Sequence, residues 1–113
     1  MNAQTGVAAM KKFQTVSVSE IKTLLQDDTA MLLDCRDLKD YRAGHIENAM
    51  HVHEGLKESL LKKGDKNKTL IIYCYYGHAS EHMAEMFGDF GFKKVFSLQG
   101  GFAAWKENQG VSG

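Results

Sequence analysis

The apolar positions along the chain fall into short unbroken runs, separated by stretches in which apolar residues recur every three or four positions. Short unbroken runs are typical of strands buried on both faces of a sheet, and the wider spacing is typical of helices that cover such a sheet. Strands are therefore predicted at 13–16, 31–33, 49–52, 69–74 and 95–98. This alternation indicates an α/β domain with a five-stranded, mainly parallel sheet flanked by helices on both faces.

The connections between the first strands carry signals for the start and end of helices. Ser17 and Glu20 have the spacing of a capping box and precede an apolar stripe. Asp37 is expected to cap a short helix that ends at Gly44, because a glycine commonly follows the last helical residue. Residues 54–62 are predicted to form a third helix, followed by a polar surface turn.

Two further helices are predicted in the second half of the chain. The first has one buried face, formed by residues at positions i, i+3, i+4 and i+7: Met83, Met86, Phe87 and Phe90. Gly91 is expected to end it. A short final helix is predicted after Gly100 and Gly101, with Phe102 and Trp105 packed against the sheet rather than forming a ligand platform.

The composition limits the class of protein. With 43% hydrophobic and 25% charged residues, the 113-residue chain has the composition of an ordinary globular domain. Its 14 basic and 14 acidic residues balance, so no overall field favours nucleic acid or an anionic membrane. Residues 1–12 are interpreted as an N-terminal tail or tag and 13–113 as one domain. The first residues lack the apolar stretch of a signal peptide and the two cysteines form no disulfide framework, which favours a cytoplasmic protein.

The candidate chemistry lies where the predicted strand 69–74 meets the following helix. Ligands of open α/β sheets bind beyond the carboxyl ends of the strands, and Cys74 stands at such an end. There it faces loop amides and the positive end of the next helix, which together stabilise a thiolate. Gly77 allows the loop to turn its amides inward. The pattern therefore predicts a nucleophilic Cys74 that acts on an anionic or polar sulfur compound.

Four motifs, in this order along the chain, resemble the rhodanese family. They are Leu33-Asp34-Cys35-Arg36-Asp37 followed by Tyr41, the stretch Ala43-Gly44-His45-Ile46-Glu47-Asn48-Ala49, the loop that begins at Cys74, and the closing stretch from Leu98 to Trp105. The resemblance runs from about Phe13 to Asn108 and is closest in style to the small single-domain thiosulfate sulfurtransferases of bacteria. It implies a rhodanese-like fold and a two-step cycle. Cys74 takes sulfur from a donor such as thiosulfate or a persulfide, and passes it to cyanide or a thiol.

The resemblance also assigns roles to the residues around Cys74. The backbone amides of the loop are expected to hold the sulfur, and these belong to Tyr75, Tyr76, Gly77, His78, Ala79 and Ser80. Asp34 and Arg36 are expected to be structural partners near the loop rather than acid–base catalysts. Many family members carry Arg or Lys in this loop, whereas here only His78 can supply a partial positive charge. A bulkier or less charged donor, or a partner protein, fits such a loop better.

Other chemistry-bearing residues receive simpler interpretations. Cys35 follows a buried apolar run and is expected to pack in the core, with a role as a resolving thiol for Cys74 as the alternative. A dense Cys/His motif is absent, so no metal or other cofactor is expected. The histidines are interpreted as ordinary polar residues despite two suggestive pairs, His51 with His53 and His78 with His82.

Two rival functions remain open at the sequence level. A cysteine phosphatase or arsenate reductase of related type ends its loop with an arginine that clamps the oxyanion, and Ser80 stands at that position here. A persulfide carrier that serves a sulfur-relay partner is compatible with every motif above. Persulfide formation with poor thiosulfate turnover is the mark of that second function.

Overall fold

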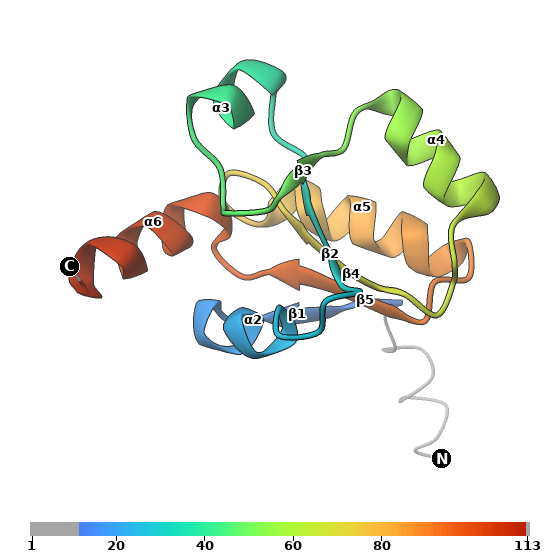
Figure 1. The fold of residues 1–113 in the computed structure, drawn as a ribbon, viewed down its shortest axis with the longest axis horizontal. Coiled ribbons are helices and arrows are strands. Elements are labelled where there is room, and N and C mark those ends of the chain that lie inside the picture. Colours follow the sequence, from blue (N-terminus) through green and yellow to red (C-terminus); the bar gives the residue numbers. More distant parts are fainter. Residues whose placement is uncertain (1–11, 113) are drawn as a thin grey trace, which may run out of the picture.

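The computed structural model describes residues 12–112, with side chains from Lys12 to Gln109. In this part of the chain, strands and helices alternate (Figure 1). The strands are β1 (Gln14–Val16), β2 (Met31–Asp34), β3 (Met50–His51), β4 (Thr69–Tyr73) and β5 (Lys94–Leu98). The helices are α2 (Val18–Leu24), α3 (Leu38–Ala43), α4 (Glu54–Lys63), α5 (His78–Asp89) and α6 (Gly101–Ser112). The division into a tail (1–12) and a domain (13–113) stays a prediction, because all of the tail but Lys12 lies outside the described residues.

The five strands form one sheet in the order β1-β5-β4-β2-β3, and every neighbouring pair is parallel. The sequence predicted a mainly parallel sheet, and the structure makes it wholly parallel. The chain builds outward in one direction through β2 and β3, and in the other through β4 and β5. Such a reversal leaves a crevice at the carboxyl ends of β2 and β4, between which the direction changes, and this is where ligands of open α/β sheets bind. The residues that follow β2 and β4 are therefore the candidates for a functional site.

Two hydrophobic clusters, one on each face, fix the layers of the molecule. Strand β4 is buried along its whole length, and its side chains alternate between the clusters. Leu70 and Ile72 belong to the first cluster, in which Phe87 of α5 and residues of α4 also lie. Ile71 and Tyr73 belong to the second cluster, which packs against α2 and α6. The prediction of helices on both faces is confirmed (Figure 1).

Local capping explains where the first two helices begin. The Ser17 hydroxyl accepts a hydrogen bond from the Glu20 amide at 3.2 Å, and the Glu20 carboxylate accepts one from the Ser17 amide at 2.8 Å. This is the predicted capping box. Helix α3 also begins after Asp37 and ends at Gly44 as predicted, but the Asp37 side chain makes no capping hydrogen bond. The Asp37 amide instead donates to the Tyr75 hydroxyl at 3.2 Å, which joins α3 to the loop after β4.

Three of the predicted elements need correction. Strand β3 covers two residues, Met50–His51, rather than the four predicted. Phe90 was placed on the buried face of α5, yet it is 55% exposed. The reason is that α5 ends at Asp89 and the chain reverses at Gly91, where φ is +106°, so that Phe92 packs edge-on against Phe87 instead. The final helix is twelve residues long and not short, and its Phe102 and Trp105 pack against the second cluster as predicted.

The lengths of the helices also bear on membranes. In the part of the chain that the structure describes, no helix has the length and apolar character needed to cross a bilayer.

Candidate active site

The carboxyl ends of β2, β4 and β5 bring the residues singled out in the sequence to one edge of the sheet. Cys74 directly follows β4, and only 3% of its surface is exposed. Its backbone carbonyl accepts a hydrogen bond from the Phe102 amide at 2.8 Å, and the Tyr75 carbonyl accepts one from the Ala103 amide at 3.1 Å. Through these two bonds the first turn of α6 is fastened to the loop that holds Cys74.

The loop after Cys74 turns back so that its own backbone faces the sulfur. The Gly77 amide lies 3.1 Å from the Cys74 Sγ and the Ser80 amide lies 3.3 Å from it, and both donate to the sulfur. Gly77 has a φ of +110°, a value that side chains with a Cβ resist, which confirms the reason given for a glycine there. Ser80 lies in the first turn of α5, so the positive end of that helix also faces the sulfur.

A hydroxyl group adds a third donor that the sequence analysis did not foresee. The Ser80 Oγ lies 3.4 Å from the Cys74 Sγ, 2.8 Å from the Ser97 Oγ and 3.2 Å from the Gly77 carbonyl oxygen, to which its hydroxyl donates while Cys74 is a thiol. Once Cys74 has lost its proton, the Ser80 hydroxyl can turn from that carbonyl to the sulfur and accept a hydrogen bond from Ser97. Ser80 and Ser97 are both buried. A serine three positions into a predicted helix carried no signal for this role, because Ser97 reaches it only through the folding of β5 beside β4.

These contacts set the ionisation of Cys74. The thiol of Cys35 hydrogen-bonds to the Cys74 sulfur and is the strongest influence that lowers its pKa, while burial acts in the opposite direction. The hydroxyl and amide of Ser80 and the amide of Gly77 lower it further. Together they bring the pKa of Cys74 down to about 4. Cys74 is therefore a thiolate at neutral pH, the form that reacts as a nucleophile.

The remaining loop residues do not bond to the sulfur. Of the six amides expected to hold it, those of Gly77 and Ser80 do so. His78 and Ala79 are exposed in the first turn of α5, and Tyr75 and Tyr76 are exposed as well. Of the six residues, two place their amides on the sulfur, two line the neighbouring cavity with aromatic side chains, and the remaining two are exposed at the start of α5.

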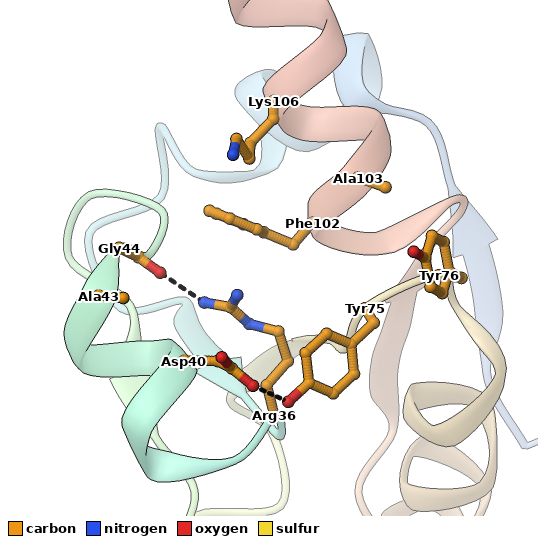
Figure 2. A pocket seen from close by; sticks show the side chains of 9 residues that line it. All are labelled: Arg36, Asp40, Ala43, Gly44, Tyr75, Tyr76, Phe102, Ala103 and Lys106. Atoms are coloured by element: carbon orange, nitrogen blue, oxygen red, sulfur yellow. Dashed lines mark hydrogen bonds between the residues drawn. The ribbon is translucent and has the colours of Figure 1, made fainter.

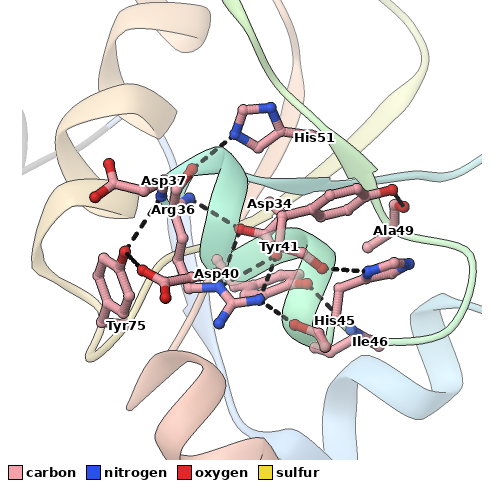
Figure 3. Close-up of polar contacts among 12 residues, drawn as sticks. Asp34, Arg36, Asp37, Asp40, Tyr41, His45, Ile46, Ala49, His51 and Tyr75 are labelled. Carbon is pink, nitrogen blue, oxygen red and sulfur yellow. Dashed lines mark hydrogen bonds and ion pairs between the residues drawn. The ribbon is translucent and has the colours of Figure 1, made fainter.

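Asp34 and Arg36 form a buried ion pair under the loop, drawn in Figure 3. The Arg36 Nη2 lies 2.8 Å from the Asp34 Oδ2, and the same nitrogen donates to the Gly44 carbonyl at 2.6 Å. The guanidinium also lies over the Phe102 ring, with 4.0 Å from its Cζ to the ring centroid. An arginine held by a carboxylate, a carbonyl and an aromatic ring ties β2, the end of α3 and α6 together. This geometry supports the structural role expected of the pair.

A cavity of about 510 Å³ opens beside the loop, as Figure 2 shows. Its walls are partly aromatic, from Tyr75, Tyr76 and Phe102, and its two cationic residues are Arg36 and Lys106. The loop itself, residues 74–80, contains no Arg or Lys. The two cationic residues come from the turn after β2 and from α6, which are distant in sequence and meet only in the folded chain.

The histidines of the first predicted pair, His51 and His53, make hydrogen bonds with nearby backbone groups. The His51 Nε2 lies 2.7 Å from the Arg36 carbonyl, and the His53 Nδ1 accepts a hydrogen bond from the Leu56 amide at 3.2 Å at the start of α4. His78 and His82 are exposed on α5. Among residues 12–112, no three His, Cys, Asp or Glu side chains form a group that could hold a metal ion.

The sheet, the loop and the nucleophile together define a class of protein. Residues 17–108 match the family model of the rhodanese-like domain, and the chain belongs to that family. Its curated relatives include thiosulfate sulfurtransferase GlpE of Coxiella burnetii, which is 34% identical over 100 residues. That alignment covers 88% of this chain and 94% of the relative.

Solved structures show the same fold. The Alr3790 protein of Anabaena has a TM-score of 0.73 at 27% identity, covering 82% of this chain and 76% of that one. The human single-domain sulfurtransferase TSTD1 has a TM-score of 0.72 at 23% identity, covering 82% of this chain and 95% of that one. RPA3614 of Rhodopseudomonas palustris, described as a possible tyrosine phosphatase, has a TM-score of 0.74 at 23% identity, covering 86% of this chain and 82% of that one. The last two likenesses establish the fold alone.

Proposed function

We propose that this protein is a sulfurtransferase that moves sulfane sulfur from a donor such as thiosulfate to a thiophilic acceptor through a persulfide on Cys74. The observation that carries the proposal is the surroundings of the sulfur. A buried Cys74 receives two backbone amides at 3.1 Å and 3.3 Å and has its pKa lowered to about 4. The likeness to the Coxiella burnetii thiosulfate sulfurtransferase over nearly the full length of both chains supports it.

In the first step the Cys74 thiolate attacks the outer sulfur of the donor. With thiosulfate, a bond forms between Cys74 and that sulfur, the sulfur–sulfur bond of the donor breaks, and sulfite leaves with the electron pair. The negative charge then lies on the terminal sulfur of the persulfide. The amides of Gly77 and Ser80 point to the place where this charge develops, so they stabilise it as amide donors stabilise an oxyanion.

In the second step the acceptor attacks the terminal sulfur and Cys74 leaves as a thiolate. Cyanide then becomes thiocyanate, and a thiol becomes a persulfide. A leaving thiolate departs faster when its pKa is low, so the hydrogen bonds that activate Cys74 in the first step also assist the second. The chemistry needs only the cysteine, the donor and the acceptor, and no metal or other cofactor takes part in it.

Among the described residues of its wall, the cavity beside the loop offers an anionic donor one cation, Lys106. Arg36 also lines the wall, but its charge is paired with Asp34, and the Asp40 carboxylate in the same wall opposes an anion. Thiosulfate and organic persulfides both present an anionic group together with a transferable sulfur. The reaction requires a thiol that stays reduced between turnovers, and we therefore place the protein in the reducing cytoplasm.

The proposal is tested by thiocyanate formation from thiosulfate and cyanide. Wild-type protein is expected to catalyse it, and Cys74→Ser and Cys74→Ala are expected to be inactive although they fold. Ser59→Ala, on the exposed face of α4, is the matched control and should match the wild type. Turnover that survives in both Cys74 variants would exclude the proposed mechanism.

A second candidate is a persulfide carrier that serves a protein partner. It is favoured by Tyr76, which lies two residues after Cys74 in the loop, is 70% exposed, lines the cavity and offers a contact for another protein. Tyr76→Ala should then slow sulfur transfer to a dithiol protein of the thioredoxin type and leave transfer to cyanide unchanged. If Tyr76→Ala transfers sulfur to the dithiol protein as fast as the wild type does, the carrier function is contradicted.

A phosphatase is disfavoured by the same loop. Ser80 provides a hydroxyl to the sulfur where such enzymes place the arginine that clamps an oxyanion. The protein is therefore expected not to hydrolyse p-nitrophenyl phosphate, and hydrolysis that depends on Cys74 would reverse this conclusion.

A further inference from the structure

Cys35 lies beside Cys74 because the two cysteines end neighbouring parallel strands at the same level. The last paired residues of β2 and β4 are Asp34 and Tyr73, so Cys35 and Cys74 are the next pair in the register. The Cys35 amide donates to the Tyr73 carbonyl at 2.9 Å, which continues the ladder past the end of the strands. Neighbouring strands lie about 4.8 Å apart, which falls within the range of about 4.4–6.8 Å between Cα atoms joined by a disulfide.

The side chains of the pair also share a face of the sheet. Side chains alternate along a strand, so Cys35 follows the parity of Leu33 and Cys74 that of Ile72. Leu33 and Ile72 both belong to the first cluster, and Cys35 packs against it, which confirms the packing expected of Cys35. Neither cysteine is part of a disulfide in the structure. Their hydrogen bond raises the pKa of Cys35 and lowers that of Cys74, which places the proton on Cys35.

We propose that Cys35 is a resolving thiol that attacks the Cys74 persulfide, releases its outer sulfur as hydrosulfide and closes a Cys35–Cys74 disulfide. This inference rests on the proposed persulfide cycle and adds to it a sulfide-releasing reaction that needs no external acceptor. The position of the two residues at the end of adjacent, in-register strands is what carries it.

The step balances without an oxidant. The Cys35 sulfur bonds to the Cys74 Sγ while the bond between that Sγ and the outer sulfur breaks. The outer sulfur leaves with the electron pair and takes the proton of Cys35, so it departs as HS⁻. That sulfur is reduced, and the two cysteine sulfurs are oxidised to the disulfide. An external dithiol reductant, the chemical class to which dithiothreitol belongs, returns both cysteines to thiols for another turnover.

The experiment follows the fate of a persulfide prepared in advance. Wild-type protein and Cys35→Ser are loaded with excess thiosulfate, freed of donor without air, and followed by intact mass and sulfide release. The wild type is expected to lose the added sulfur, release one equivalent of sulfide and end with a peptide crosslink between Cys35 and Cys74. Cys35→Ser is expected to keep the sulfur until cyanide is added. Cys35→Ala, which replaces the thiol with a small apolar side chain, serves as a second variant and should also keep it.

The outcomes separate this step from the cycle on which it rests. If the wild type holds its sulfur as long as both Cys35 variants do, or releases sulfide without the crosslink, the resolving role is wrong and the persulfide cycle stands. If neither the wild type nor the variants gain sulfur, the proposed function fails and the resolving step fails with it.

Discussion

At the scale of single residues, the reactivity of Cys74 depends on how a buried sulfur comes to carry a negative charge. Burial alone would keep Cys74 protonated, because it removes the water that stabilises a thiolate. The thiol of Cys35, the hydroxyl and amide of Ser80 and the amide of Gly77 outweigh that effect. Cys35 comes from the end of β2, and Gly77 and Ser80 come from the loop after β4 and the first turn of α5. The charge on Cys74 is therefore a property of the folded chain and not of its sequence neighbours alone.

The first prediction concerns pH. Since the pKa of Cys74 is about 4, the thiolate is present above that pH and is lost as the pH falls through it. The rate of alkylation by iodoacetamide should be nearly constant between about pH 6 and 8 and should drop to half near pH 4. Cys74→Ser, in which Cys35 remains protonated, should react slowly throughout. A wild-type profile with its midpoint near 8.5 would show that the donors do not stabilise the thiolate.

The second prediction isolates one donor. Ser80→Ala removes the hydroxyl that lies 3.4 Å from the Cys74 sulfur and keeps the amide. A hydrogen bond to a charged group contributes about 1.5–3 kcal/mol, so the midpoint of the alkylation profile should rise by about one pH unit or more. Ser59→Ala on the exposed face of α4 is the control. An unchanged midpoint in Ser80→Ala would remove the hydroxyl from the account.

At the scale of elements, the loop keeps its shape because α6 is fastened against it. Gly101 opens α6 with a φ of +60°, and a Cβ there would lie 2.6 Å from the Cys74 carbonyl oxygen and 2.7 Å from the Tyr75 carbonyl oxygen. The close approach permits the hydrogen bonds from Phe102 and Ala103 to the loop. A glycine is therefore required where the helix meets the loop.

This contact yields the third prediction. Gly101→Ala forces the first turn of α6 away from the loop and should cost about 2 kcal/mol of unfolding free energy, together with most of the thiocyanate-forming activity. Gly44→Ala is the matched control, because its backbone is extended and nothing lies within 4 Å of the added Cβ. Urea denaturation measures both variants. Equal free energies of unfolding for Gly101→Ala and Gly44→Ala would show that the close packing of α6 against the loop does not require a glycine at position 101.

The elements also show how far the sequence could predict this molecule. Each predicted strand and helix exists, because apolar runs and caps such as Ser17 with Glu20 are local signals. The position of Cys74 at the carboxyl end of β4 and the positive φ of Gly77 followed from the strand–loop–helix order. Three spatial arrangements could not be predicted from the sequence. They are the contact of the Ser80 hydroxyl with the sulfur, the position of Lys106 at the cavity, and the placement of Cys35 beside Cys74. They depend on which strands become neighbours, and the strand order is not a local property.

At the scale of the whole molecule, one sheet separates two clusters that share strand β4. Every residue of β4 is buried, and its side chains serve both clusters in turn. Loss of either cluster exposes the same strand. Unfolding should therefore be a single cooperative transition, as is usual for a domain of this size. The single tryptophan, Trp105, packs against the second cluster, so its fluorescence follows the unfolding of that cluster.

The fourth prediction uses two phenylalanines near the end of α5. Phe87→Ala empties a fully buried site in the first cluster and should cost about 3–5 kcal/mol, whereas Phe90→Ala, at a side chain 55% exposed, should change the free energy of unfolding by about 0.5 kcal/mol or less. The midpoints from Trp105 fluorescence and from circular dichroism should coincide in each variant. A fluorescence midpoint that does not move in Phe87→Ala would mean that the clusters unfold separately.

The measurement that tests the central claim most directly is the intact mass of the protein after incubation with thiosulfate, for the wild type and for Cys74→Ser. To hold the persulfide long enough to weigh it, the same comparison is made in the Cys35→Ser background. The account predicts a gain of one sulfur atom that cyanide removes and that is absent whenever Cys74 is replaced. Added sulfur that persists in Cys74→Ser, or no added sulfur in any form of the protein, would contradict it.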